Sequence, residues 1–574
     1  MALRVALVTP FAWSQPHDVN EHVAGLAREL RARGHHVTVL GPSNRARDLA
    51  AGRRALAHGL DDEFVALGPA VPISRLSRMG VPMGVRANLA VALAAGGFDI
   101  VHGFEPGLPS LSYLALRDTD ALTVATFFSP DRLSYPPART RRERLLGRLD
   151  ALLATSEETA EAAAERFPGR YELVPLGVDV PEAGEKRRLI VLEWHPNERP
   201  LLRALVRELV ELPDWELALL RTRPLASRPP LPRPLRGRVR VRTALDGETR
   251  SALLLEAAVF VPAVEGSARV ELEARAAGAA VVAPPGRALQ PELAAAEAAR
   301  LMEDPAFRAE RADSGIASAR DESYTSLADE VMAVYTAISR RRRPVPAKAA
   351  RDAGEWITAD LHMHTSWSHD CSIEIDELLD HAEAEGLGAI AVTDHNVLGG
   401  ALEAVERARG RDLVVIAGEE VKTAGQGEVI GLFLKEEIPR GLGFTETVEA
   451  IRSQGGLVYV PHPFDRMHAI PDAATLHRHL GEIDVLEVYN ARLLFEAYND
   501  EAVRFARKYN LTAGAGSDAH VLPGVGTGAV RMRRFEGPED FLLSLRGAEI
   551  LRRPKSLAYL QGLKWVAQAK ERVR

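Results

Sequence analysis

Short apolar runs alternate with longer amphipathic segments through the first third of the chain. The run LRVALVTP is followed by HVAGLARELRARGH, whose apolar residues recur at helical spacing, and then by the apolar run HVTVLGP. A buried strand, a helix and a second buried strand in this order indicate a crossover unit of a parallel sheet. Further runs follow at FDIVHG, ALTVATFF and DALLATS. We therefore predict a doubly wound, Rossmann-like α/β domain over residues 1–175.

The same alternation begins again after residue 176. RRLIVLEW, WELALLRT, AAVFVPAV and AAVVAP read as strands, and alanine-rich segments between them read as helices, so residues 176–339 are predicted to form a second Rossmann-like domain. The segment RRRRPVPAKAARDAG then combines like charges with two prolines, which favours an interdomain linker over residues 340–355. Its four arginines are interpreted as a solvated helix end, with phosphate binding as the alternative.

Residues 356–574 show a third pattern, in which short apolar runs end in polar residues. The runs are TADLHMH, GAIAVTD, LVVIAGEE, VIGLFL, LVYVPH, DVLEVYN and TAGAGSD. Strands of this kind separated by helices predict an α/β barrel with its site at the carboxyl ends of the strands. The last segment, KSLAYLQGLKWVAQAKERVR, has helical periodicity and a basic tail; we predict a helix packed on the barrel, with binding to an anionic membrane as the alternative.

Composition narrows the class of protein. The 72 basic and 79 acidic residues give a net charge of -7, which argues against a partner such as long nucleic acid. The chain has one cysteine, Cys371, so no intramolecular disulfide can form, and a reducing compartment fits. The N-terminus reads as a strand rather than a signal peptide, and no apolar stretch of about 20 residues predicts a membrane span. We expect a cytoplasmic protein.

Potential metal ligands stand at the ends of the C-terminal runs or in the loops after them. They are His362, His364, Asp370, His395, Glu420, His462, Asp518 and His520. Residues two apart in a strand point to the same side, so each of the pairs His362/His364 and Asp518/His520 can face one cavity. A single histidine at a strand end is usually structural. Five histidines and three carboxylates recurring at such positions predict a metal site, because a packed core does not accept unpaired polar groups.

These segments resemble the PHP family, named for the polymerase and histidinol phosphatase domains. DLHMHT, SHD, TDH, GEE, VPHP and GSDAH occur in the family's order over about residues 356–545. The resemblance implies a distorted seven-stranded barrel, two or three divalent ions and hydrolysis of phosphoesters. It also implies three ligand groups: His362, His364, Glu420 and Asp518 for one ion, Glu420 and His462 for a second, and Asp370, His395 and His520 for a third.

One position departs from the family pattern. Where many members have a histidine, GQGEVIGLF offers Glu428, which is either a metal ligand or a solvent-facing acid. An added oxygen ligand favours manganese, magnesium or iron over zinc, although metal availability can override this preference. Such ions would activate water for attack on phosphorus, so no protein nucleophile is expected. Asp394 is a candidate for orienting a ligand imidazole, and the candidate phosphate contacts are His369, Arg466 and Arg492.

The N-terminal half resembles the retaining GT-B glycosyltransferases, in particular the large family 4. The resemblance rests on VEGSARVELEARAAGAAVVAP, with Glu265 and Glu273 eight residues apart, on LVPLGVD and on RGHHVTVL. It covers about residues 1–340 and implies that a nucleotide-sugar donor lies between two domains, with Glu273 on its ribose. Arg199 is the one candidate for the cation that clamps the donor pyrophosphate.

Three departures predict that this module has lost part of its catalytic equipment. The first loop reads QPHDVNEH where the family has a glycine pair, Phe128 replaces a histidine, and LEWHPNERP supplies Arg199 together with the repulsive Glu193. Losing the clamp weakens diphosphate binding by several kcal/mol, on the scale of charge-assisted hydrogen bonds. The leading hypothesis is a metal-dependent phosphoesterase acting on a small phosphomonoester or nucleotide. The alternatives are a working nucleotide-sugar glycosyltransferase with an accessory phosphatase domain, and a non-catalytic protein that binds glycan or nucleotide.

Overall fold

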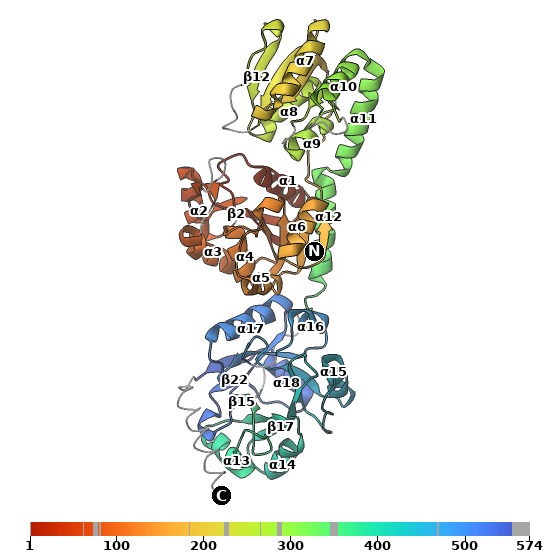
Figure 1. The fold of residues 1–574 in the computed structure, drawn as a ribbon. Helices are drawn as coiled ribbons and strands as arrows, with labels where there is room; N and C mark the ends of the chain where they lie inside the picture. The colour runs from red at the N-terminus through yellow and green to blue at the C-terminus, as the bar shows by residue number, and fades with distance from the viewer. Residues whose placement is uncertain are drawn as a thin grey trace. The chain divides into compact units, whose positions relative to one another are not determined.

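The computed structural model divides the chain into two compact units, residues 1–338 and 339–574 (Figure 1). It describes residues 2–60, 62–72, 78–79, 82–182, 184–222, 229–263, 266–283, 290–344, 354–467 and 470–553. Glu265, residues 345–353 of the predicted linker and the predicted helix at residues 555–574 lie outside the described residues.

The first unit begins with a seven-stranded parallel sheet of order β3-β2-β1-β6-β7-β8-β9. Its strands are β1 (Arg4–Val8), β2 (His36–Gly41), β3 (Phe64–Ala66), β6 (Ile100–Phe104), β7 (Leu122–Phe127), β8 (Ala151–Ala154) and β9 (Tyr171–Leu173). Its helices are α1 (Asp18–Ala32), α2 (Ala46–His58), α3 (Pro82–Gly96), α4 (Leu111–Asp118), α5 (Arg139–Leu146) and α6 (Glu157–Arg166). Every residue of β6 and β7 is buried, as expected where helices cover both faces of a parallel sheet. A two-stranded ribbon, β4 (Val71–Pro72) with β5 (Arg78–Met79), is separate from this sheet.

A second parallel sheet in the same unit has the order β12-β11-β10-β13-β14. Its strands are β10 (Arg187–Glu193), β11 (Glu216–Arg221), β12 (Val239–Thr243), β13 (Ala257–Val261) and β14 (Ala280–Val281). Its helices are α7 (Arg199–Glu211), α8 (Gly247–Glu256), α9 (Ala268–Ala276), α10 (Pro291–Glu303) and α11 (Pro305–Asp321). The pair of Rossmann-like sheets agrees with the fold class predicted from the apolar runs.

The last helix of the first unit, α12 (Tyr324–Ser339), has a hydrogen bond to a strand of the first sheet. The hydroxyl of Tyr335 lies 2.8 Å from Nδ1 of His102 in β6, whose Nε2 lies 2.6 Å from the Thr126 hydroxyl of β7. All three side chains are buried. Although residues 176–339 were predicted as one domain, their final helix is therefore bonded to strands of residues 1–175.

The second unit contains a nine-stranded sheet of order β21-β20-β19-β18-β17-β16-β15-β22-β23. Its strands are β15 (Trp356–Met363), β16 (Ala389–His395), β17 (Val414–Lys422), β18 (Glu428–Leu432), β19 (Leu457–Val460), β20 (Val485–Asn490), β21 (Thr512–Gly516), β22 (Gly528–Arg533) and β23 (Glu549–Arg552). Its helices are α13 (Ile375–Ala384), α14 (Gly399–Arg407), α15 (Phe444–Ser453), α16 (Ala473–Arg478), α17 (Glu496–Tyr509) and α18 (Pro538–Leu545). A bridge between Met363 and Ala519 brings the two ends of the β15–β21 series together, so these strands form a nearly closed barrel.

Each of the seven predicted strands of this unit is present, but one runs in the opposite direction. β18 is antiparallel to both β17 and β19, because a short turn instead of a helix joins it to β17. Lys422 at the end of β17 therefore pairs with Glu428 at the start of β18. Because of this reversal, the first residue of β18 lies at the edge of the barrel where the neighbouring strands β17 and β19 end.

The described 3₁₀ helices are η1 (Pro130–Arg132), η2 (Pro196–Glu198), η3 (Arg233–Leu235) and η4 (Leu522–Gly524). The predicted linker begins with arginines that are bound to the second unit. Arg342 donates to the backbone oxygen of Lys508 at 2.8 Å, and Arg343 donates to the backbone oxygens of Gly481 and Ile483. These two arginines therefore hold backbone carbonyls of their own unit.

The close packing around Gly516, beneath the edge of the barrel, predicts how a substitution there affects stability. A Cβ at Gly516 would lie 2.3 Å from Cβ of His362 and 2.9 Å from Oε1 of Glu487. Gly516→Ala should therefore lower the free energy of unfolding of the second unit by about 1–3 kcal/mol, the usual cost of overpacking. Gly481→Ala is the control, because a Cβ there meets nothing within 4 Å. Denaturant unfolding of both variants measures the effect, and equal stability of the two would contradict the prediction.

Candidate metal centre

The candidate ligands of the second unit converge on one edge of the barrel. The described residues around a cavity of about 210 Å³ are His369, Asp370, His395, Asn396, Glu420, Lys422, Glu428, His462, Arg492 and Asp518. Ligand atoms of His362, His364 and His520 complete close groups with these side chains, all within 4.8 Å of one another in each group. The structure thus brings together every residue that was predicted as a metal ligand.

The first group surrounds the end of β15. Nε2 of His362 lies 3.3 Å from Nε2 of His364, and each of these nitrogens lies 3.5 Å from Oε2 of Glu420. Oδ1 of Asp518 is 3.9 Å from the His362 nitrogen and 3.5 Å from that of His364. All four side chains are buried. The group matches the first ligand set that the sequence resemblance implied.

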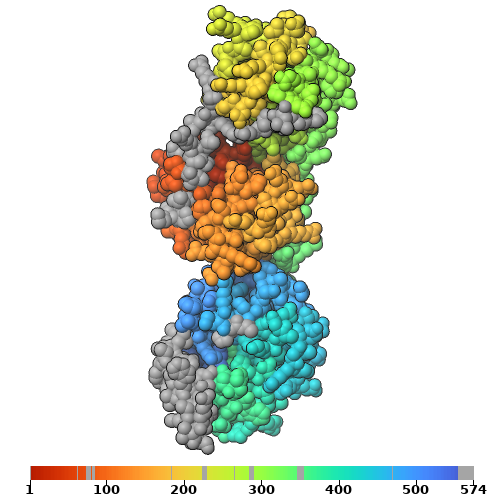
Figure 2. Space-filling model, viewed as in Figure 1, coloured from red at the N-terminus to blue at the C-terminus, as the bar shows by residue number. Residues whose placement is uncertain are grey.

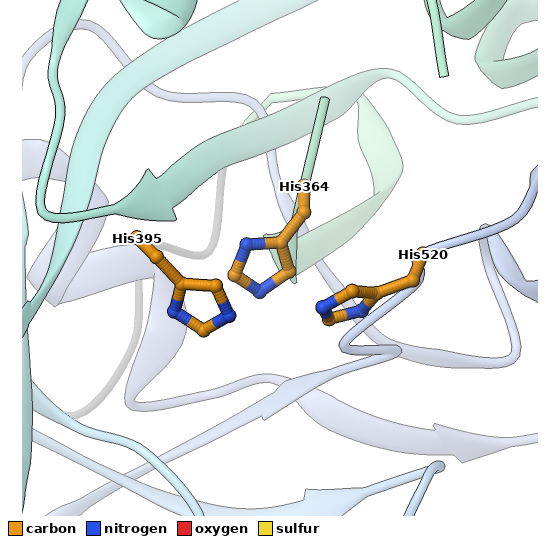
Figure 3. Close-up of side chains that lie close together, drawn as sticks. All are labelled: His364, His395 and His520. Atoms are coloured by element: carbon orange, nitrogen blue, oxygen red, sulfur yellow. The ribbon is translucent and has the colours of Figure 1, made fainter. Parts of the chain in front are cut away.

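A second group lies on the other side of His364. Figure 3 shows the rings of His364, His395 and His520, which come from three separate segments and lie together. The carboxylate of Asp370 joins them, with Oδ2 at 3.1 Å from Nε2 of His520 and Oδ1 at 3.6 Å from Nε2 of His395. His395 also approaches Glu420, at 3.0 Å from its Oε2. Glu420 is therefore shared between groups.

The third group contains the residue that departs from the family pattern. Nε2 of His462 lies 3.1 Å from Oε1 of Glu420 and 3.7 Å from Oε2 of Glu428. The Glu428 side chain is 13% exposed and lines the cavity, so it is not a solvent-facing loop acid. The reversed direction of β18 explains how its first residue reaches the site.

Two of these residues have left-handed backbone conformations. The φ angle is 27° at His462 and 51° at Asp518, a region that costs residues other than glycine about 1–3 kcal/mol. Strain of this kind persists only where the surrounding structure fixes it. Here the backbone N–H of Asp518 donates to the carbonyl of His362 at 2.7 Å, and that of His462 donates to Glu487 at 2.7 Å.

The charges of the centre favour ligand binding. Burial alone raises the pKa of Glu420, but His362, His395 and His462 bring it well below its usual value. Burial also raises the pKa of Asp518, while Arg492 and His362 hold it well below that of an ordinary aspartate. Both carboxylates are therefore ionised and can bind cations.

The histidines differ in their protonation. Burial, together with His520, lowers the pKa of His364 well below its ordinary value, which leaves its imidazole neutral. Burial lowers the pKa of His462, but Glu420 and Glu487 more than reverse this and raise it to about 9. The pKa of His362 is likewise raised above its ordinary value by Glu487 and Glu420 in spite of burial.

The donor set fits divalent cations. Nδ1 of His362 is held by Glu487 at 3.1 Å and Nδ1 of His364 by the Ser368 hydroxyl at 3.1 Å, so their Nε2 atoms face each other. Two imidazole lone pairs at 3.3 Å repel, and a proton or a cation must lie between them. Imidazole nitrogens mixed with carboxylate oxygens suit manganese, iron and zinc.

Three buried carboxylates support the ligands from outside the ligand groups. The sequence did not indicate two of them, Glu487 and Asp360, and indicated a different contact for the third, Asp394. Glu487 of β20 contacts His362, and Asp360 of β15 accepts hydrogen bonds from the backbone of Ser517 and Gly526, both at 2.9 Å. Asp394, expected to orient a ligand imidazole directly, instead accepts from the Ser368 hydroxyl at 2.7 Å. The only local signal for Glu487 and Asp360 is an acidic residue inside a mostly buried strand.

The predicted phosphate contacts fall into two classes. Arg492 and His369 line the cavity, and Nη1 of Arg492 lies 3.1 Å from Oδ1 of Asp518. Lys422, which the sequence did not single out, also lines it. Arg466 is exposed and is not among the described residues around the cavity.

The single cysteine of the chain lies beside the centre, where Sγ of Cys371 is 3.3 Å from the backbone oxygen of His364.

The first unit contains a larger cavity, of about 850 Å³, lined by residues of α1, α8 and α9 (Figure 2). Glu273 borders it, but both of its carboxylate oxygens bind Arg250, at 2.6 Å and 2.7 Å. Arg250 also lies 2.5 Å from Oε2 of Glu21 in α1. The acid expected to contact a donor ribose is therefore engaged in a buried ion pair.

The predicted pyrophosphate clamp lies elsewhere. Arg199 is exposed at the first residue of α7 and is not among the described residues that line the larger cavity. Glu193, at the end of β10, is buried and accepts a hydrogen bond from the Thr222 hydroxyl at 2.9 Å.

Among the described residues, no helix is long and apolar enough to cross a membrane.

Family models match a region in each half of the chain. Residues 19–182 match the model of Glycosyltransferase Family 4, residues 360–509 match that of the PHP domain, and residues 496–550 match a PHP-associated region. The PHP match spans the described metal cluster apart from Asp518 and His520, which lie within the PHP-associated match.

Individual proteins and structures are similar to parts of this chain. A phosphatidyl-myo-inositol mannosyltransferase of Propionibacterium freudenreichii is 31% identical over 300 residues, which cover 49% of this chain and 77% of that protein. An uncharacterized protein of Methanocaldococcus jannaschii is 34% identical over 214 residues, covering 35% and 85%. A glycosyltransferase structure from Rickettsia africae aligns with a TM-score of 0.41 at 14% identity, covering 59% and 99%. The chain thus belongs to glycosyltransferase family 4 through its N-terminal region and to the PHP domain family through its C-terminal region.

Proposed function

We propose that the second unit hydrolyses small phosphoesters with the help of two or three bound divalent ions. The observation that carries this proposal is the convergence of five histidines and four carboxylates on one cavity at the barrel edge. These side chains are too many, too close and too well buried to be explained by core packing, which avoids clustered ionisable groups.

Three overlapping groups would hold the ions. His362, His364, Glu420 and Asp518 form one, Glu420, Glu428 and His462 another, and Asp370, His364, His395 and His520 the third. Divalent ions bound there supply an activated water and neutralise charge on the phosphoryl oxygens. Because Glu420 contacts histidines of every group, it fixes their spacing.

Cationic side chains at the cavity would bind and orient the phosphoryl group. Arg492 is 30% exposed, and its guanidinium already faces the carboxylate of Asp518, so it can reach an oxygen of a bound phosphate. Lys422 and His369 line the same cavity, where they can donate hydrogen bonds to phosphoryl oxygens. No described side chain is required to act as a nucleophile.

The size of the cavity limits what it can enclose. A volume of about 210 Å³ is below the roughly 300–1,000 Å³ typical of pockets that enclose a drug-sized ligand. The cavity therefore fits the phosphate end of a substrate, while the leaving group extends outward. A small phosphomonoester or a nucleotide satisfies this limit, and the net charge of -7 disfavours long nucleic acid.

Glycosyl transfer by the first unit is the second candidate. It is favoured by the 31% identity to a mannosyltransferase and by the 850 Å³ cavity beside Glu273. Two observations weigh against it. Both carboxylate oxygens of Glu273 are bound to Arg250, and Arg199 is exposed, so neither Glu273 nor Arg199 is arranged to hold a nucleotide-sugar donor.

Mutation of the first ligand group should abolish hydrolysis. We expect Mn²⁺-dependent release of phosphate from a panel of phosphomonoesters, and a loss of at least about 100-fold in kcat/KM for His362→Ala, because an ion-binding imidazole is removed. EDTA should remove the activity and Mn²⁺ should restore it. His381→Ala, on α13 and outside the described metal groups, is the control and should retain activity. Activity that survives in His362→Ala would contradict the proposal.

Replacement of Glu428 tests the group of Glu420, Glu428 and His462 separately. Glu428→Gln should lower the number of Mn²⁺ ions bound per chain by one or weaken the weakest site, because an anionic oxygen ligand is lost. Glu428→His should retain the ion by supplying an imidazole. Metal analysis of the purified chains measures this, with the exposed Glu449→Gln of α15 as control. Unchanged stoichiometry and affinity in Glu428→Gln would show that Glu428 is not a ligand.

For the second candidate, glycosyl transfer, we expect no turnover of a nucleotide-mannose donor by the full chain, because both carboxylate oxygens of Glu273 are bound to Arg250. Donor consumption followed by chromatography is the measurement. Turnover that is lost in Glu273→Gln but retained in His362→Ala and in Glu271→Gln, a control on the same helix, would overturn this expectation and establish a transferase. Nucleotide binding without either turnover would instead indicate a binding protein.

A further inference from the structure

Glu487 is a carboxylate buried beneath the metal centre that the proposed hydrolysis does not itself use. It lies in β20, where Val485 and Tyr489 belong to the apolar core of the barrel. Its side chain is fully buried. A charge in such a place is costly unless hydrogen bonds compensate it, so its partners show what it does.

Both carboxylate oxygens of Glu487 are saturated by buried donors. Oε1 lies 3.1 Å from Nδ1 of His362 and 3.0 Å from the hydroxyl of Tyr459. Oε2 accepts from the backbone N–H of His462 at 2.7 Å and from the side-chain amide of Asn490 at 3.0 Å. Four donors from four positions thus meet on one side chain.

The contact with His362 fixes the direction of that ligand. The other three partners of Glu487 donate hydrogen bonds to it, so Oε1 serves as an acceptor and Nδ1 of His362 is the ring nitrogen that carries the hydrogen in this contact. Nε2 is then the atom directed at Glu420, His364 and Asp518. Carboxylates bound to the far nitrogen of an imidazole commonly set the tautomer and raise the basicity of a metal ligand.

The contact with His462 fixes a second ligand through its backbone. The φ angle of 27° at His462 lies in the left-handed region, and the bond from its N–H to Glu487 holds it there. This conformation directs Nε2 of His462 at Glu420 and Glu428. Asn490, bound to the same carboxylate, also lies 3.4 Å from Oδ2 of Asp518.

We propose that Glu487 is the positioning residue of this metal centre: it sets the tautomer of His362 and the backbone of His462, and so the spacing of the two ligand groups that share Glu420. This inference rests on the proposed metal-dependent function. Glu487 does not contact the cavity and acts only through the side chains above it.

Glu487→Gln tests this role with little change of shape. The amide offers one accepting oxygen, and its NH₂ group faces donors, so at least two of the four hydrogen bonds are lost. The metal-stripped full chain should bind Mn²⁺ about 10- to 100-fold more weakly by calorimetry, as is usual for the loss of such a partner. The visible absorption of the Co²⁺-loaded protein should also change, because it reports ligand geometry rather than stability.

The control is Glu419→Gln. Glu419 is equally buried and adjacent to Glu420, but it lies on the opposite side of β17, where it accepts from the backbone N–H of Ile438 at 2.8 Å. Its Mn²⁺ affinity and Co²⁺ spectrum should equal those of the wild type. If Glu487→Gln does not fold, Glu487→Asp, which keeps the charge but withdraws the oxygens by one methylene, makes the same comparison.

Equal Mn²⁺ affinity in the wild type and the Glu487 variant would overturn the inference, and so would equal losses in the Glu487 and Glu419 variants. Because the readout is metal binding, it is independent of turnover. A wild-type chain that binds Mn²⁺ but hydrolyses no phosphomonoester contradicts the proposed function, whereas a variant that binds normally contradicts the role of Glu487 alone.

Discussion

The buried carboxylate of Glu420 is the charge around which the second unit is organised. It lies within 3.0–3.5 Å of nitrogens of His362, His364, His395 and His462, which belong to all three candidate ligand groups. An ionised carboxylate in this position is stable only because positive charge surrounds it, whether from protonated imidazoles or from cations. The histidines in turn need their own partners, so the network extends outward into the barrel.

That extension explains why further carboxylates lie inside the barrel core. Glu487 supports His362 and His462 from below, while Asp394 acts on the other side through Ser368. Asp360 joins β15 to the backbone of Ser517, next to Asp518. Each accepts several hydrogen bonds, which offsets the cost of burying its charge. Rigidity of this kind holds the left-handed backbone of His462 and Asp518, which isolated peptides disfavour.

The first unit uses buried charge differently. Arg250 is paired with Glu273 and Glu21, which lie on α9 and α1 and line the larger cavity. Because both acids bind the same guanidinium, their carboxylate oxygens already have a partner inside the protein. A family-4 region thus provides the fold, while its charged groups are arranged for internal contacts. The centre of the second unit instead directs its ionised groups at a common space.

The sequence by itself determined the alternation of strands and helices and the candidate ligands, because apolar periodicity and the PHP motifs are local signals. The runs predicted as strands in both Rossmann-like sheets and in the barrel are strands in the structure, whereas β3, β9, β12, β22 and β23 were not predicted. Only the tertiary structure decided the direction of β18, which brings Glu428 to the cavity, and the return of α12 to the first sheet. It also decided the pairing of Arg250 with Glu273 and the role of Glu487, which is 125 residues from His362. Contacts of this range depend on how the sheet closes, and no local pattern encodes them.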